Sequence, residues 1–112
     1  MNLTHHSSDG HLTITVKDTR IDAVVAIQFK DRMRELTSNG PEHILLDLRN
    51  VDFIDSSGLG AIVAAMKQLD DRQQLDLAGL TPNVAKVFRL TRMDTIFAIY
   101  PDVDSAVARS GP

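Results

Sequence analysis

The sequence predicts an α/β domain in which helices pack on a mixed β-sheet, and three observations lead to that fold class. Short apolar runs of strand length alternate along the chain with longer runs whose apolar residues recur every three or four positions. Such an alternation is typical of a sheet covered by helices. The first two strands flank a turn signal, Ser8-Asp9-Gly10, and should therefore form a hairpin, which makes the expected sheet mixed.

The first half of the chain supplies three strands and one helix. Residues 11–16, HLTITV, alternate apolar and polar and predict a half-buried strand, hairpinned to another over residues 3–8. Asp22 predicts the N-cap of a helix from Ala23 to about Ser38, which Asn39-Gly40-Pro41 ends. Within residues 43–48, Ile44, Leu45, Leu46 and Leu48 are apolar and do not strictly alternate with polar residues, as expected of a strand covered on both faces.

The second half continues the alternation of helix and strand. After residues 53–55 a helix is expected to bury an apolar stripe made of Leu59, Ile62, Val63, Met66 and Leu69. Residues 75–78 predict a strand. Thr81 should then cap a helix over residues 82–89, with Pro82 at its first position. A strand around residues 96–99 and a short helix starting near residues 102–105 complete the pattern.

Composition excludes several classes of function. A net charge of -3 argues against a nucleic acid as direct partner, because nucleic-acid-binding domains carry clustered basic surfaces. The absence of cysteine removes thiol chemistry and cysteine-based metal sites, and neither a metal site nor a bound cofactor is expected. No apolar run is long enough to span a membrane, and the N-terminus lacks the layout of a signal peptide. We therefore expect a cytoplasmic protein without membrane insertion.

The stretch FIDSSGLG, residues 53–60, places two hydroxyls, a carboxylate and two glycines between a predicted strand and a predicted helix. A hydrolase nucleophile would need the pattern G-x-S-x-G and a nearby base, and the stretch has neither. Gly58-Leu59-Gly60 is too short for a phosphate-binding loop, and Asp55 would repel a phosphate. An enzyme is therefore not expected.

Two interpretations of this corner remain on residue pattern alone. Asp55 or Ser56 could simply cap the following helix. Alternatively, Ser56 could itself receive a phosphate, since the first amides and the dipole of a helix favour an anion there. A cap explains neither the second serine nor Gly58 in the first helical turn, where glycine costs about 1 kcal/mol relative to alanine.

The segment LLDLRNVDFIDSSGLGAIVAAMKQL resembles the central motif of STAS domains, the family of bacterial anti-sigma factor antagonists. The likeness is specific over residues 44–69 and looser over most of the chain. Asp22 matches the aspartate of the family's G-x-L-D-x stretch, although Thr19 replaces its glycine, and residues 80–88 fit its third helix. The resemblance implies a single STAS domain over residues 1–112.

The resemblance also implies a function, namely a binding protein switched by phosphate. The first serine of D-S-S-G, here Ser56, would be phosphorylated by a partner anti-sigma factor that is a serine kinase. Unmodified chain would sequester that anti-sigma factor and release its sigma factor, and a metal-dependent serine phosphatase would reset the switch. The implied phosphorylation site is Ser56, and the implied partner surface comprises Asp22, Asp55, Ser56, Ser57, Gly58, Leu59, Gly60 and Val63.

Two alternatives stay open. The chain could be the STAS subunit of a lipid-transport ABC complex, docking on its ATPase. It could also bind an anti-sigma factor that lacks kinase activity, with a separate kinase modifying Ser56. Within the first interpretation Ser56 is the expected acceptor, whereas Ser57, one residue further along, should help to hold the corner.

Overall fold

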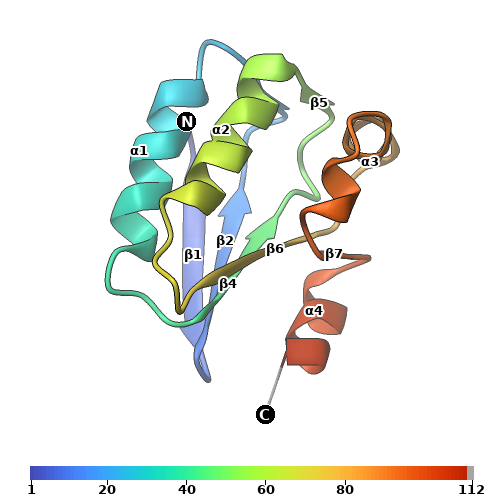
Figure 1. Ribbon diagram of the computed structural model, residues 1–112. Helices are drawn as coiled ribbons and strands as arrows, with labels where there is room; N and C mark the ends of the chain where they lie inside the picture. The colour runs from blue at the N-terminus through green and yellow to red at the C-terminus, as the bar shows by residue number, and fades with distance from the viewer. Residues whose placement is uncertain (111–112) are drawn as a thin grey trace.

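The computed structural model describes residues 1–110 and shows a mixed sheet with four α-helices (Figure 1). The main sheet has the strand order β1 (Leu3–Ser8), β2 (His11–Val16), β4 (His43–Asp47), β6 (Gln74–Ala78), β7 (Ile99–Tyr100). A second, two-stranded sheet joins β3 (Arg20–Ile21) and β5 (Phe53–Ile54). The helices are α1 (Ala26–Thr37), α2 (Ser56–Lys67), α3 (Pro82–Leu90), the 3-10 turn η1 (Met93–Thr95) and α4 (Val103–Ser110).

The predicted mixed sheet is confirmed. β1 pairs antiparallel with β2, whereas the β2–β4, β4–β6 and β6–β7 pairs are all parallel. The hairpin turns at Asp9 and Gly10, whose φ angles of 51° and 81° are both in the left-handed region. Glycine adopts that conformation freely and aspartate tolerates it, which is why this dipeptide makes a tight turn.

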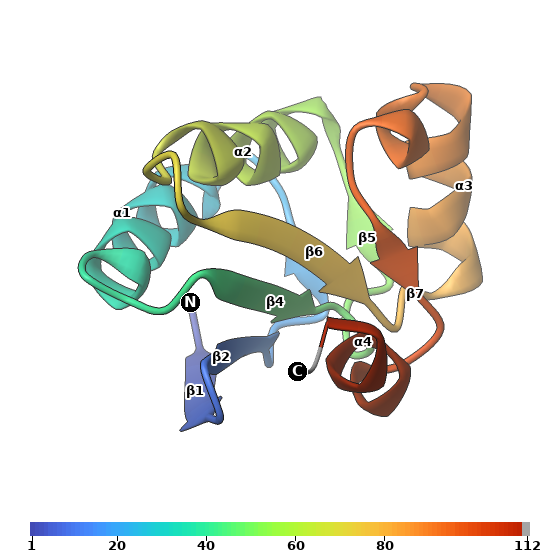
Figure 2. The same cartoon turned by 60° about the horizontal axis from the view of Figure 1, so that its bottom comes forward.

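The sheet has helices on both faces, as Figure 2 shows. α1 and α2 lie over one face and α4 over the other. The main core forms beneath α1 and α2 and includes Phe29, Ile62 and the inward side chains Ile14 and Leu46. A smaller cluster of Leu45, Ala78 and Ala106 holds α4 against the opposite face. β4 is therefore covered on both faces, as its non-alternating apolar residues predicted.

The first helix begins three residues later than predicted. Asp22 does not cap α1: its Oδ1 accepts the Val24 N–H at 3.1 Å and its carbonyl accepts the Val25 N–H at 3.1 Å. These bonds close a turn before the helix, which starts at Ala26 after an N-cap residue, Val25, without a side-chain cap. The β-branched pair Val24-Val25 disfavours helix at this point, so the turn prevails.

The buried stripe of α2 also differs from the predicted one. Its fully buried residues are Gly58, Ala61, Ile62 and Ala65, while Leu59, Val63 and Met66 are half-buried at the margins of the core. The helix therefore packs through its small side chains, which allow close approach to the neighbouring backbone. Leu69 lies beyond the helix end at Lys67.

Two details in the C-terminal third also depart from expectation. Thr81 occupies the N-cap position of α3, but its hydroxyl donates to the Val51 carbonyl at 2.7 Å and does not cap the helix. The last strand covers Ile99–Tyr100 and not residues 96–99, because η1 occupies Met93–Thr95. The predicted final helix is present as α4.

Candidate functional site

The small parallel pair β3–β5 brings two distant loops together. Ile21 lies opposite Ile54, so the residues that follow, Asp22 and Asp55, leave the pair side by side. The chain then turns from β3 toward α1 and from β5 into α2 (Figure 1). The Asp22 loop and the Ser56 loop thus lie side by side, through a strand pair that the sequence pattern did not reveal.

Asp55 connects the start of α2 to the loop after β3 by hydrogen bonds. It is the N-cap of α2, where its Oδ1 accepts the Gly58 N–H at 2.8 Å. Its Oδ2 accepts the Ala23 N–H from the other loop at 3.2 Å, and its own N–H donates to the Ile21 carbonyl at 3.4 Å. One carboxylate therefore begins the helix and fixes the second loop, so Asp55, and not Ser56, is the cap.

Gly58 has a structural reason for being glycine. A Cβ built on it would overlap the Ile21 carbonyl oxygen and crowd the Ile54 side chain. Gly58 is buried, and α2 can approach β3 closely only because no side chain separates them. This contact explains a glycine in the first turn of a helix, where it lowers helix stability.

Ser56 and Ser57 are both exposed at the first two positions of α2. Neither hydroxyl makes a hydrogen bond within residues 1–110, so no hydrogen bond supports the expectation that Ser57 holds the corner. Their backbone N–H groups point out of the first helical turn and likewise have no acceptor among the described residues. The fold therefore makes no use of either hydroxyl.

The remaining predicted surface residues surround the serines. Asp22 is half-buried, and its Oδ2 accepts from Arg20 Nε at 3.3 Å. Gly60 is exposed with nothing within 4 Å of a Cβ built on it. Leu59 and Val63 are half-buried and pack against the core, so each offers only part of its side chain to the surface.

Four further residues at this corner were not among the predicted site residues. Val24 and Ile27 are 82% and 69% exposed, and Phe53 is 40% exposed with the Arg20 guanidinium 4.2 Å from its ring centroid. Ile27 lies off the apolar stripe of its helix, and this position in the sequence could have indicated that its side chain is exposed. The others depend on the β3–β5 pairing, which local patterns did not indicate.

The histidines lie away from Ser56. His5 and His6 are on β1, while His11 and His43 begin adjacent strands and stack at 5.0 Å between ring centroids. The serine corner follows the opposite, carboxyl-terminal ends of these strands (Figure 1). No imidazole is placed to activate Ser56, and residues 1–110 contain no cluster of His, Asp and Glu suited to a metal ion.

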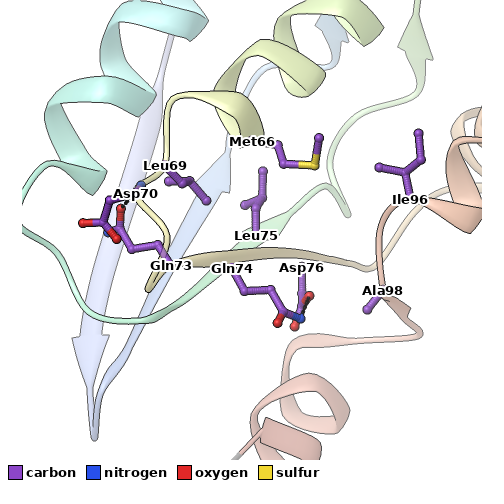
Figure 3. Close-up of a pocket in the computed structure, with 9 residues that line it drawn as sticks. All are labelled: Met66, Leu69, Asp70, Gln73, Gln74, Leu75, Asp76, Ile96 and Ala98. Atoms are coloured by element: carbon purple, nitrogen blue, oxygen red, sulfur yellow. Dashed lines mark hydrogen bonds between the residues drawn. The ribbon is translucent and has the colours of Figure 1, made fainter.

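A hollow at the far end of α2 is separate from this corner. Figure 3 shows it between Met66 and Leu69 on one side and β6 on the other, with a volume of about 220 Å³. Its polar groups bond with each other: the Gln74 side chain donates from Nε2 to Asp76 Oδ1 at 2.8 Å, and the backbone N–H of Asp70 donates to Gln73 Oε1 at 3.2 Å. Its volume is below the range usual for ligand pockets.

Within residues 1–110, no helix combines the length and the apolar character needed to cross a membrane.

Comparison with known proteins agrees with the motif. A relative described as an anti-sigma-B factor antagonist of Listeria monocytogenes is 33% identical over 90 residues, covering 80% of this chain and 78% of that protein.

Solved structures give the same fold. The crystal structure of an anti-sigma factor antagonist from Mycobacterium paratuberculosis superposes with a TM-score of 0.87 at 24% identity, covering 96% of this chain and 92% of that one. The antagonist SpoIIAA in its unphosphorylated form superposes with a TM-score of 0.77 at 19% identity, covering 96% and 95%. Residues 2–106 match the family model described as STAS domain, so the chain belongs to the STAS domain family.

Proposed function

We propose that this chain is an anti-sigma factor antagonist whose binding is switched by a phosphate on Ser56. The observation that carries the proposal is that Ser56 is exposed at the start of α2 while Asp55 does the capping. A serine that the fold does not need, in a D-S-S-G corner, is free to serve a partner. The resemblance of this motif to the family's phosphorylated serine supports the assignment.

The physics of the corner suits a reversible phosphate. A phosphoserine adds a charge of about -1.5 to -2. At the first helical position it meets the positive end of the α2 dipole and the unbonded N–H groups of Ser56 and Ser57. The fold should therefore tolerate the modification, and its effect should appear at a partner's surface.

The partner is an anti-sigma factor, which we propose to be the serine kinase for Ser56 as well. ATP and magnesium would then belong to the partner, and a metal-dependent serine phosphatase would remove the phosphate. The chain itself acts by binding and not by catalysis. Because sigma factors act on RNA polymerase, this exchange would take place in the cytoplasm.

The proposed contact surface is the predicted one, with roles divided by burial. Ser56, Ser57 and Gly60 are exposed and would touch the partner directly. Asp22, Asp55, Leu59 and Val63 are half-buried and would contribute their outer atoms. Gly58 lies beneath them and sets the position of the helix start.

Phosphorylation should weaken this complex at least about tenfold. A like charge forced into an interface costs several kcal/mol, and each 1.4 kcal/mol is a factor of ten. The test uses each serine-kinase anti-sigma factor of the source genome, purified and titrated by calorimetry into unmodified, phosphorylated and Ser56→Ala chain. We expect Ser56→Ala to bind like the unmodified chain and to be insensitive to the kinase.

The site of modification is checked by phosphopeptide mapping after incubation with kinase and MgATP. Ser57→Ala should be modified normally, while Ser56→Ala should not be modified. Phosphate found only on Ser57 would contradict the assignment. Equal affinity of the unmodified, phosphorylated and Ser56→Ala chains for the anti-sigma factor would contradict the proposed switch. Binding to an ATP-binding transport subunit, and to none of the anti-sigma factors, would favour the transport alternative.

A further inference from the structure

Two large apolar side chains are left in solvent beside the serine corner. Val24 is 82% exposed and Ile27, one turn later, is 69% exposed. Phe53, on β5, is 40% exposed, and the Arg20 guanidinium lies over its ring. A single exposed apolar side chain is ordinary, whereas a group of them beside a functional corner marks an interaction site.

Val24 also forms a wall of a hollow with a volume of about 420 Å³, the Val24 hollow. Its lining comes from one continuous segment and consists of Asp18, Thr19, Arg20, Asp22, Val24 and Val25. The segment is the loop that leads from β2 through β3 to α1. The hollow is thus large enough to receive a side chain of another protein.

The two carboxylates that line the hollow, Asp18 and Asp22, already have partners inside the chain. Asp18 Oδ1 accepts the Asn2 N–H at 2.6 Å, and Asp22 accepts from Arg20 and from the Val24 N–H. Because these carboxylates are engaged, they give a polar ligand little to gain. The Val24 side chain is 82% exposed, and covering it removes apolar surface from water. The hollow therefore favours an apolar occupant.

Hydrogen bonds of Asp55 connect the Val24 hollow to the serine corner. Asp55, the residue before Ser56, holds the Ala23 N–H, and Ala23 immediately precedes Val24. The same Asp55 N–H reaches the Ile21 carbonyl. A protein that contacts Ser56 at the start of α2 would also lie over this loop.

We propose that the Val24 hollow receives an apolar side chain of the anti-sigma factor, with Ile27 packing beside it. This inference rests on the proposed function and adds to it that affinity and switching depend on different residues. Val24 and Ile27 provide affinity that does not depend on phosphorylation, and Ser56 provides the switch. The residues that set partner choice are then on the loop before α1 and in the first turn of α1, and not within the D-S-S-G corner.

The first test measures affinity for the purified anti-sigma factor that binds the unmodified chain. Full burial of a valine or isoleucine side chain contributes enough to predict a loss of about tenfold for Val24→Ser and for Ile27→Ser. Leu90→Ser is the matched control, since Leu90 is 70% exposed on α3, on the other side of α2 from α1 (Figures 1 and 2). All three variants should melt like the parent, because the changed side chains are exposed.

The second test needs no partner protein. Isobutanol, which mimics an aliphatic side chain, is titrated into the chain while backbone amide signals are followed by NMR. Shifts at Thr19, Val24 and Val25 that disappear in Val24→Ser support the hollow. No shift there, or unchanged shifts in Val24→Ser, would overturn the proposal.

The two tests separate the possible failures. The proposed occupant would be overturned if isobutanol binds the hollow while Val24→Ser and Ile27→Ser keep full affinity for the anti-sigma factor. If the hollow binds isobutanol but no anti-sigma factor binds the unmodified chain, the proposed function fails, and with it the occupant named here. A loss in Leu90→Ser equal to that in Val24→Ser would also overturn the proposal, because the effect would not be specific to the hollow.

Discussion

Gly58 and Gly60 are two residues apart on α2 and have opposite surroundings. Gly58 packs on the Ile21 carbonyl, where a methyl group has no room, whereas Gly60 faces open space. The same substitution should therefore have opposite effects on stability at the two positions. This contrast separates a glycine required for packing from a glycine compatible with a partner surface.

Gly60→Ala should raise the free energy of unfolding by about 1 kcal/mol, because alanine favours helix over glycine by that amount. Gly58→Ala should lower it by more than this, because the methyl group forces α2 away from β3. Thermal and urea unfolding would measure both. If Gly60 also borders the anti-sigma factor, Gly60→Ala should weaken binding while stabilising the fold. Equal unfolding free energies for the two variants would contradict this packing account.

Asp22 offers a second residue-scale prediction. Asp22→Asn keeps an acceptor for the Val24 N–H and loses the exposed ion pair with Arg20, which contributes at most about 1 kcal/mol. We therefore expect a small change in melting temperature and a clear loss of affinity for the anti-sigma factor. Asp31→Asn, an exposed change on α1, is the control. Unchanged affinity in Asp22→Asn would exclude Asp22 from the interface.

At the scale of the element, α4 depends on a carboxylate at its start. Asp102 Oδ1 accepts the Ser105 N–H at 2.7 Å. The backbone and side-chain hydrogen bonds from Ser105 lower the pKa of Asp102 below its ordinary value of 3.8. A lowered pKa in the folded state means that the ionised carboxylate stabilises the helix above that ordinary value. The stabilisation is lost as the pH falls through the lowered pKa.

The start of α4 should therefore open in acid. Amide exchange in α4 should accelerate as the pH is lowered below 3.8, relative to the intrinsic exchange rate at each pH. In Asp102→Asn this acid-dependent component should vanish, because asparagine can accept the same bond without titrating. NMR titration of the Asp102 carboxyl gives the pKa directly. Identical acid dependence in the parent and in Asp102→Asn would refute the role of this bond.

At the scale of the whole molecule, the two faces of the sheet are unequally built. The core beneath α1 and α2 contains most of the buried apolar residues, whereas α4 is held by the small cluster of Leu45, Ala78 and Ala106. Regions with few buried apolar contacts open at lower free energy than the global core. α4 should therefore be the least protected of the packed helices, and β2 and β4 the most protected elements.

Native-state hydrogen exchange tests this ranking. At neutral pH we expect amides of α4 to exchange at least about tenfold faster, after correction for intrinsic rates, than those of β4. Phosphorylation of Ser56 should leave the protection of β4 nearly unchanged, because the phosphate lies on the surface of α2. Equal protection of α4 and β4 would show that the chain opens only as a whole.

The local patterns of the chain determined most of its elements. Alternation predicted β2, a short apolar run without alternation predicted β4, and Ser8-Asp9-Gly10 predicted the hairpin, because each depends on neighbours within a few residues. The D-S-S-G corner was visible for the same reason, and its resemblance to the STAS motif indicated the family that the comparisons confirmed.

Tertiary structure decided what lies around that corner. The pairing of β3 with β5 decides which carboxylate caps α2, why Gly58 must be glycine and which side chains flank Ser56. The bond between Asp55 and Ala23 joins residues 32 positions apart, and the two-residue strands that bring them together are too short for any periodicity. Contacts of that range depend on how the whole sheet packs, so the segment alone could not indicate that Val24 remains in solvent beside Ser56.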